Sequence, residues 1–152
     1  MKLEDQFVIE APIDLVWKFF LDIPRVATCV PGVEIVDQLD EENINVILAI
    51  KVGPIKAKFN GKVSITDLDP PNRLTARGEG RDANTASMVS ATFSAILSDV
   101  DKNKTAVNYS VDVVIRGKLG QFGQGVIRAT AKRITSVFVE CVQEKVANQS
   151  QL

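Results

Sequence analysis

The strongest constraint on the fold is a long amphipathic segment near the C-terminus, residues 119–147. At helical spacing its apolar side chains form one broad stripe, and polar residues such as Gln124, Arg128 and Lys132 lie mostly opposite. A helix of this length extends about 40 Å. The rest of the chain must therefore supply a wide apolar surface that buries the stripe. The stripe contains Leu119, Phe122, Val126, Ile127, Thr130, Ile134, Val137, Phe138, Cys141 and Val142.

Length and charge limit the class of protein. The 152 residues predict a single domain over residues 1–152, large enough to build its own core. With 18 basic and 19 acidic residues the net charge is −1, so no nucleic-acid partner is expected. No apolar run approaches the ~18 residues of a membrane span, and the first residues are too acidic for a signal peptide. We expect a cytoplasmic protein, with peripheral contact at the inner face of the membrane left open.

The absence of histidine narrows the chemistry further. It removes the commonest general base, the usual partner of a nucleophilic serine or cysteine, and the ligands of most catalytic zinc sites. We therefore expect no catalytic residues, no metal site and no cofactor. The two cysteines, Cys29 and Cys141, lie on apolar segments far apart in the sequence, and buried free thiols are expected in preference to a disulfide or a reactive site.

Before the long helix, the chain reads mainly as strands in which apolar and polar residues alternate. Lys2–Ile9 predicts a first strand, followed by a short helix near Ile13 and a second near Arg25–Cys29. Short turns then separate further strands, so we expect an α+β fold with a curved antiparallel sheet of about seven strands around the C-terminal helix. The later strands are expected at residues 33–38, 44–52, 55–65, 73–81, 89–97 and 107–115.

Three Gly/Pro-based motifs occur in this framework, at residues 29–34 (CVPGVE), 52–63 (VGPIKAKFNGKV) and 117–123 (GKLGQFG). With the order of elements, they resemble the carbon monoxide dehydrogenase CoxG family of the START/Bet v 1-like (SRPBCC) superfamily. The resemblance implies a helix-grip fold that holds a hydrophobic ligand. It also implies a link to molybdenum-containing dehydrogenases, through maturation, membrane recruitment or handling of a quinone-like electron acceptor.

Several residues that face the helix from the sheet are small, notably Ala57, Gly61, Ala76 and Ala91. Small residues under a helix leave either space or close contact. With the resemblance, we expect space: a cavity that binds a hydrophobic small molecule, lipid or quinone-like, without catalysis. The expected cavity residues are Phe59, Val63, Gly78, Gly80, Met88, Phe93, Tyr109, Phe122, Val126 and Phe138.

Other interpretations stay open at this point. The cavity could serve a cyclase- or hydrolase-like enzyme in which Tyr109 works with a carboxylate, or the interior could be filled in a structural adaptor. Besides its ligand, the protein could contact a molybdenum-hydroxylase complex or, through its sheet edges, a second copy of itself.

Two surface features complete the sequence-based hypotheses. Gly120, Gly123 and Gly125 weaken the start of the helix, because glycine costs about 1 kcal/mol against alanine there, and predict either a hinge over the cavity or close packing. The outward lysines predict either an anionic lipid surface or acidic partner site, or simple solubility. They are Lys51, Lys56, Lys58 and Lys62.

Overall fold

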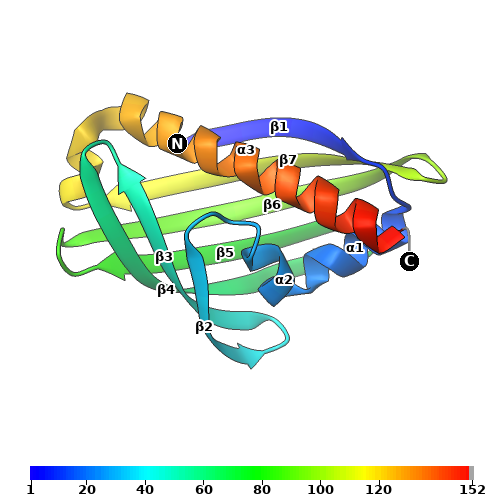
Figure 1. The fold of residues 1–152 in the computed structure, drawn as a ribbon, viewed down its shortest axis with the longest axis horizontal. Coiled ribbons are helices and arrows are strands. Elements are labelled where there is room, and N and C mark those ends of the chain that lie inside the picture. Colours follow the sequence, from blue (N-terminus) through cyan, green and yellow to red (C-terminus); the bar gives the residue numbers. More distant parts are fainter. Residues whose placement is uncertain (151–152) are drawn as a thin grey trace.

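The computed structural model describes residues 1–150, and for Val36, Gln149 and Ser150 it describes the backbone alone. Within these residues the chain forms one seven-stranded sheet and three α-helices (Figure 1). In order, the elements are β1 (Lys2–Ile9), α1 (Ile13–Leu21), α2 (Ile23–Ala27), β2 (Val33–Asp40), β3 (Asn43–Val52), β4 (Ile55–Asp69), β5 (Arg73–Asp82), β6 (Ser87–Asp101), β7 (Lys104–Arg116), the 3₁₀ helix η1 (Lys118–Phe122) and α3 (Gly123–Ser150).

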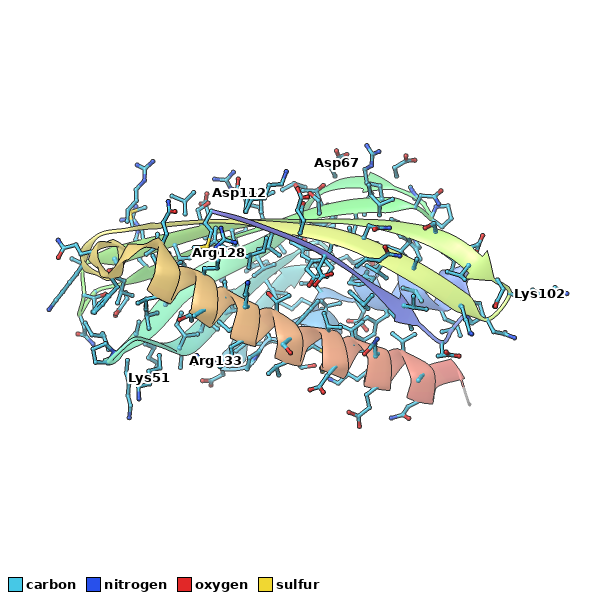
Figure 2. All side chains as sticks on the ribbon, turned by 90° about the horizontal axis from the view of Figure 1, so that it is seen from above. Lys51, Asp67, Lys102, Asp112, Arg128 and Arg133 are labelled. Atoms are coloured by element: carbon cyan, nitrogen blue, oxygen red, sulfur yellow. A yellow bond between two sulfur atoms is a disulfide. The ribbon has the colours of Figure 1, made fainter. Side chains whose placement is uncertain are left out.

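The sheet is an antiparallel meander that β1 closes at one edge. Its strand order is β1-β7-β6-β5-β4-β3-β2, so each strand from β2 to β7 pairs with the next, and β1 pairs with β7. All three α-helices lie on the same face of this curved sheet, and α3 runs along its length (Figures 1 and 2). The predicted α+β helix-grip fold is confirmed.

Local chemistry explains the two short helices. Pro12 precedes α1, and its missing N–H costs nothing at a helix start. Asp22 ends α1 and also begins α2, where its carboxylate accepts a hydrogen bond from the Arg25 amide at 3.4 Å. This shared residue turns the chain sharply, so that α2 leaves α1 and reaches the β2–β3 side of the sheet.

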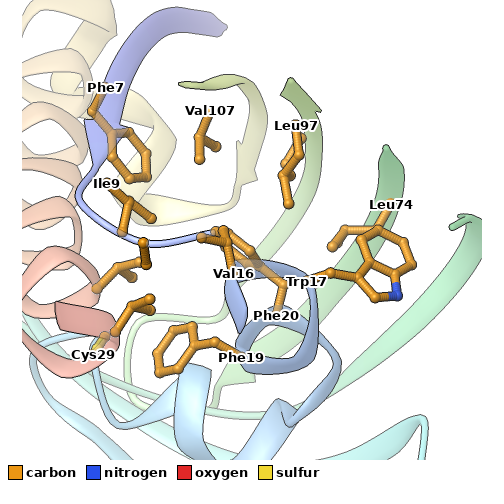
Figure 3. Packing of buried hydrophobic residues seen from close by; sticks show 14 residues of the cluster. Phe7, Ile9, Val16, Trp17, Phe19, Phe20, Cys29, Leu74, Leu97 and Val107 are labelled. Atoms are coloured by element: carbon orange, nitrogen blue, oxygen red, sulfur yellow. The ribbon is translucent and has the colours of Figure 1, made fainter. Parts of the chain in front are cut away.

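The main core lies under the C-terminal half of α3 (Figure 3). Val142 and Val146 are fully buried there, and they belong to the same cluster as Ile9 of β1 and Val16 and Phe19 of α1. Burying aliphatic side chains of this kind stabilises the fold by roughly 1.5–3 kcal/mol each. The C-terminal half of α3 is therefore its anchored half. None of the described helices has the length and apolar character needed to cross a membrane.

Two sequence-based expectations are wrong. The sequence predicts a helix that starts at residue 119. In the structure residues 118–122 form η1, and α3 begins only at Gly123, which has φ +84°. Cys29 and Cys141 were expected as free thiols, but they form a disulfide. Their Cα atoms lie 5.3 Å apart although 112 positions separate them, because the chain after α2 folds back against α3. The alternating strand pattern contains no signal of that contact.

Candidate functional site

A cavity of about 350 Å³ lies between the sheet, the segment that contains α2, and the first half of α3. This volume falls within the range of small-molecule sites, roughly 300–1,000 Å³. Most of its wall is aliphatic or aromatic. The apolar wall comprises Phe20, Ile23, Val26, Ala27, Val30, Val33, Val46, Leu48, Ile50, Val52, Phe59, Val63, Ile65, Leu74, Ala76, Val89, Ala91, Phe93, Val111, Val113, Ile115, Ile127, Ala131, Ile134 and Phe138.

The three glycines in the wall have different roles. A Cβ placed on Gly78 would meet nothing closer than Val63 Cγ2 at 3.8 Å, so this residue leaves open space. A Cβ on Gly80 would lie 3.2 Å from Phe59 Cβ, and one on Gly61 would collide with the Glu79 carbonyl oxygen. Gly78 thus creates room, whereas Gly61 and Gly80 allow close approach of β4 and β5. Both interpretations of the small residues hold, at different positions.

Polar groups at the cavity are few, and most are already bonded. The hydroxyls of Thr130 and Thr135 donate to carbonyl oxygens one turn back in α3, at 3.0 and 2.8 Å. Arg77 and Glu79 pair at 2.8 Å with both side chains more than half exposed, so they reach the cavity wall through their backbone. Lys62 is likewise exposed and alternates with inward neighbours.

Tyr109 is the ionisable side chain that remains in the wall. Its ring stacks on Phe93 at 6.3 Å between centroids and contacts Phe7 edge-on at 5.7 Å. Burial, followed by the negative charge of Asp5, raises the pKa of Tyr109 above its ordinary value. Asp5 is the residue directly opposite Tyr109 in the β1–β7 pair. The phenol therefore stays protonated at neutral pH and can donate a hydrogen bond to a ligand.

The structure places most of the expected cavity residues in the wall: Phe59, Val63, Gly78, Gly80, Phe93, Tyr109 and Phe138. Met88 is wrongly placed by the sequence-based prediction. It is 45% exposed because it alternates with Ser87 and Val89 and so points to the outer face of the sheet. Phe122 and Val126 lie outside the cavity, where both would contact a Cβ on Gly53 at 3.7 Å. They pack in a cluster beside the β3–β4 turn, in which other members, such as Val52 and Phe59, do line the cavity.

Sequence reasoning missed one wall of the cavity. Residues of α2 and the following turn line it, among them Ile23, Val26 and Val30. Their apolar character was visible in the sequence, but a five-residue helix carries no periodicity that says where it docks. The stripe on α3 did contain further wall residues, Ile127 and Ile134, although the sequence did not separate cavity from core.

The three glycines of the proposed hinge also differ from one another. A Cβ on Gly120 would come within 2.9 Å of the Ile115 carbonyl oxygen, so Gly120 permits close packing on β7. Gly123 occupies a positive φ that other residues rarely adopt, and Gly125 faces open space. Gly123 interrupts the helical backbone between η1 and α3. The hinge motion at this point stays a prediction.

Basic side chains gather where the β3–β4 turn meets α3. Lys51 and Lys56 are exposed and directly opposite in the β3–β4 pair. The Arg133 guanidinium donates to the Lys51 carbonyl oxygen at 3.4 Å, and Figure 2 shows these two residues at the same edge of the molecule. In the described part of the chain, no group of acidic or cysteine side chains is placed to hold a metal ion.

A curved antiparallel sheet that grips a long C-terminal helix defines the START/Bet v 1-like fold. The family model of the carbon monoxide dehydrogenase CoxG subunit matches residues 6–147, and the chain belongs to this family. A search of curated proteins returns no match.

Solved structures share the fold over nearly their whole length. A conserved protein from Geobacillus kaustophilus aligns with a TM-score of 0.87 and 20% identity, covering 97% of this chain and 96% of the other. The ZhuI aromatase/cyclase from Streptomyces sp. R1128 gives 0.71 and 18%, covering 98% and 94%. A START superfamily protein from Mycobacterium smegmatis gives 0.63 and 8%, covering 97% and 98%.

Proposed function

We propose that this protein binds a hydrophobic small molecule, of lipid or quinone-like chemistry, in the cavity between α3 and the sheet and does so without catalysis. The observation that carries the proposal is the apolar cavity of about 350 Å³. An apolar wall offers water few partners, since a buried water typically makes about three hydrogen bonds. An apolar ligand is the occupant that this wall favours.

The packing of the wall supports the same conclusion. Side chains that border an unfilled space have no packing partners on that side. An apolar ligand would supply those contacts and would remove the apolar wall from water.

Among the described side chains of the wall, one free donor indicates what the polar part of the ligand looks like. Thr130 and Thr135 already donate within α3, so the Tyr109 hydroxyl is left to meet a ligand oxygen. A mainly apolar molecule with one carbonyl or hydroxyl group fits this arrangement. Lipids and quinone-like molecules both have this character.

Membership of the CoxG family supports a more specific setting. We place the protein on the cytoplasmic side, as an accessory to a molybdenum-containing carbon monoxide dehydrogenase-like enzyme. The exposed lysines Lys51 and Lys56, next to Arg133, would suit contact with an anionic membrane face from which an apolar ligand could be drawn.

Native mass spectrometry of gently purified protein, followed by organic extraction, tests the binding proposal. We expect a co-purified apolar molecule small enough to fit the cavity, and we expect the organic solvent to release it. The matched control is Gly78→Leu, which fills the open space beside Val63. Equal ligand content in both proteins, or failure of the wild type to bind any lipid or quinone that is offered, would count against the proposal.

An enzyme acting on a hydrophobic substrate is the second candidate. The Tyr109 phenol beside Asp5 favours it, because a carboxylate next to a phenol can move a proton. The ZhuI aromatase/cyclase shows the same fold. Turnover of a hydrophobic substrate that disappears in Tyr109→Phe, with binding retained, would establish this role in place of the carrier.

A further inference from the structure

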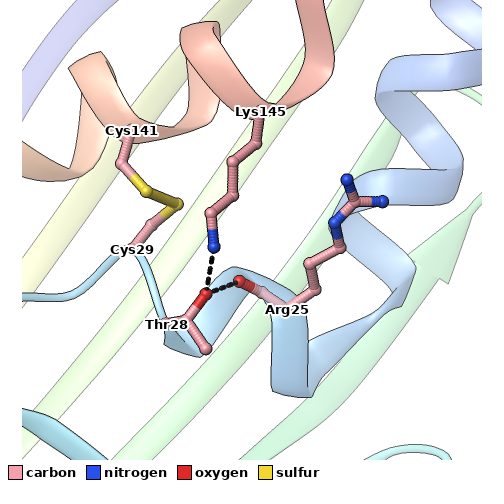
Figure 4. Close-up of a disulfide and its surroundings, with 5 residues drawn as sticks. All are labelled: Arg25, Thr28, Cys29, Cys141 and Lys145. Carbon is pink, nitrogen blue, oxygen red and sulfur yellow. Dashed lines mark hydrogen bonds between the residues drawn. A yellow bond between two sulfur atoms is a disulfide. The ribbon is translucent and has the colours of Figure 1, made fainter. Parts of the chain in front are cut away.

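The disulfide connects two walls of the cavity (Figure 4). Cys29 follows α2 and lies between Ala27 and Val30, which both line the cavity. Cys141 lies on α3, three residues after Phe138, another wall residue. We call residues 23–33 the α2 segment. The bond thus fastens the α2 segment to α3 next to the space between them.

Apart from the disulfide, one hydrogen bond links the described side chains of the α2 segment to α3. The Lys145 ammonium donates to the Thr28 hydroxyl, which in turn donates to the Arg25 carbonyl oxygen at 2.6 Å (Figure 4). This bond is exposed, so water competes with it. The covalent bond is therefore the main directional tie between the two walls.

The α2 segment has separate attachments to the sheet. Ile23 and Ala27 pack with Ile44 and Val46 of β3, and the Ala49 amide donates to the Gly32 carbonyl oxygen at 2.9 Å. These contacts do not involve α3. If the disulfide opens, the contacts with β3 remain. Towards α3 the segment then keeps only the exposed hydrogen bond and the packing of Cys29 and Val26 in the main core, which hold it less tightly than a covalent bond does.

We propose that Cys29–Cys141 is a reducible latch that controls how fast a ligand enters and leaves the cavity, and that a dithiol reductant opens it. The inference rests on the proposed function, because a latch needs a ligand to retain. In a cytoplasmic setting, disulfides are typically transient and respond to the thiol pool. Because this bond joins two walls of the cavity, its reduction would change how easily a ligand reaches the cavity.

The chemistry is ordinary thiol–disulfide exchange. A thiolate of the reductant attacks the sulfur of Cys141, which is the partly exposed partner, whereas Cys29 is only 2% exposed. The S–S bond breaks, and Cys29 leaves as a thiolate that takes up a proton. The second thiol of the reductant then attacks the mixed disulfide, releases Cys141 as a thiol and leaves as its own disulfide. Two electrons and two protons pass to the protein.

Ligand release measured in the two redox states tests the latch. The protein is loaded with the fluorescent fatty acid cis-parinaric acid, and its release is followed by stopped flow before and after treatment with dithiothreitol. We expect release to accelerate at least tenfold on reduction. The Cys29→Ser/Cys141→Ser variant should release the probe as fast as the dithiothreitol-treated wild type does. Dithiothreitol should not change the release rate of this variant. Lys145→Met, which removes the hydrogen bond and keeps the disulfide, should remain slow and still respond.

A local readout separates a latch from a general staple. Amide hydrogen exchange of residues 23–33 should accelerate on reduction, while β6 and β7 keep their protection. Equal release rates of bound probe in both states overturn the latch and leave the proposed function standing. So does titration of two free thiols in protein purified without reductant. If neither form takes up the probe or any lipid, while exchange in the α2 segment still responds, the proposed function has failed and the bond guards no ligand site.

Discussion

Gly78→Leu offers the sharpest test of the cavity, because it should stabilise the protein and abolish binding at once. The Cβ site of Gly78 meets only Val63 Cγ2 at 3.8 Å and the Lys62 carbonyl oxygen at 4.0 Å, and the cavity lies beyond. The backbone of Gly78 does not have a positive φ, so a larger residue causes no strain.

The expected gain can be worked out from two contributions. Burying a leucine side chain is worth about 1.5–3 kcal/mol. Removing a glycine from a strand interior adds about 0.5–1 kcal/mol. The free energy of unfolding of the ligand-free protein should thus rise by about 2–4 kcal/mol. For a domain of this size the melting temperature should rise by about 4–16 °C.

The assay uses protein stripped of ligand, since a bound ligand would itself raise the melting temperature. Calorimetry gives the stability, and fluorescent fatty-acid titration gives the affinity, which we expect to fall at least tenfold. Gly80→Leu is the matched control on the same strand and face. Its Cβ would lie 3.2 Å from Phe59 Cβ, so overpacking should destabilise it by about 1–3 kcal/mol.

Two results would refute the reasoning in different ways. If Gly78→Leu destabilises as much as Gly80→Leu, the space beside Val63 does not exist in solution. If Gly78→Leu is stabilised but binds the fatty acid as well as the wild type does, the space exists and the ligand lies elsewhere.

Three further expectations concern other parts of the molecule. Burial and the charge of Asp5 raise the pKa of Tyr109 in the folded protein above 10.0. The contribution of Tyr109 to the free energy of unfolding is therefore fully present below pH 10.0 and is lost as pH rises through the raised pKa. Tyr109→Phe should flatten the alkaline fall in melting temperature. Gly125→Ala should stabilise α3 by up to about 1 kcal/mol, whereas Gly123→Ala, at φ +84°, should cost about 1–3 kcal/mol; chemical denaturation distinguishes the two. Replacing both cysteines by serine opens a loop of 112 residues and should cost up to about 5 kcal/mol, measured the same way, while an unchanged midpoint would contradict the bond.

The fold was predictable because the apolar residues repeat mainly with the period of a strand before residue 117 and with the period of a helix after it. The inward residues of β3, from Ile44 to Val52, alternate without interruption, and the stripe on α3 returns at helical spacing. From β2 to β7 each strand follows the last by a short turn, so the local pattern also determines which of these strands are neighbours.

The cavity was only partly predictable, because its two walls carry different amounts of information. Phe93 and Tyr109 could be placed from the period of their strands. Val26 and Val30 could not, since the direction of α2 depends on how the shared cap Asp22 turns the chain. The same turn brings Cys29 to Cys141, so one conformational detail hid both a cavity wall and a disulfide. The error at Met88 has a different origin, because the alternation that places Val89 inward also points Met88 outward.

The two halves of α3 differ in how firmly they are packed, and under the proposed function they would serve stability and binding respectively. Val142 and Val146 in the second half are fully buried among side chains of β1 and α1, so this half cannot leave without loss of the core. In the first half, Ile134 and Thr135 face the cavity and remain partly exposed, and the backbone that leads into it is broken at Gly123. Local stability follows buried contacts. A ligand should therefore raise the local stability of the first half of α3 most, because it would supply packing contacts that the empty cavity lacks. If the proposed function is right, a helix anchored at one end and placed over an unfilled space at the other would let the protein admit a ligand without unfolding.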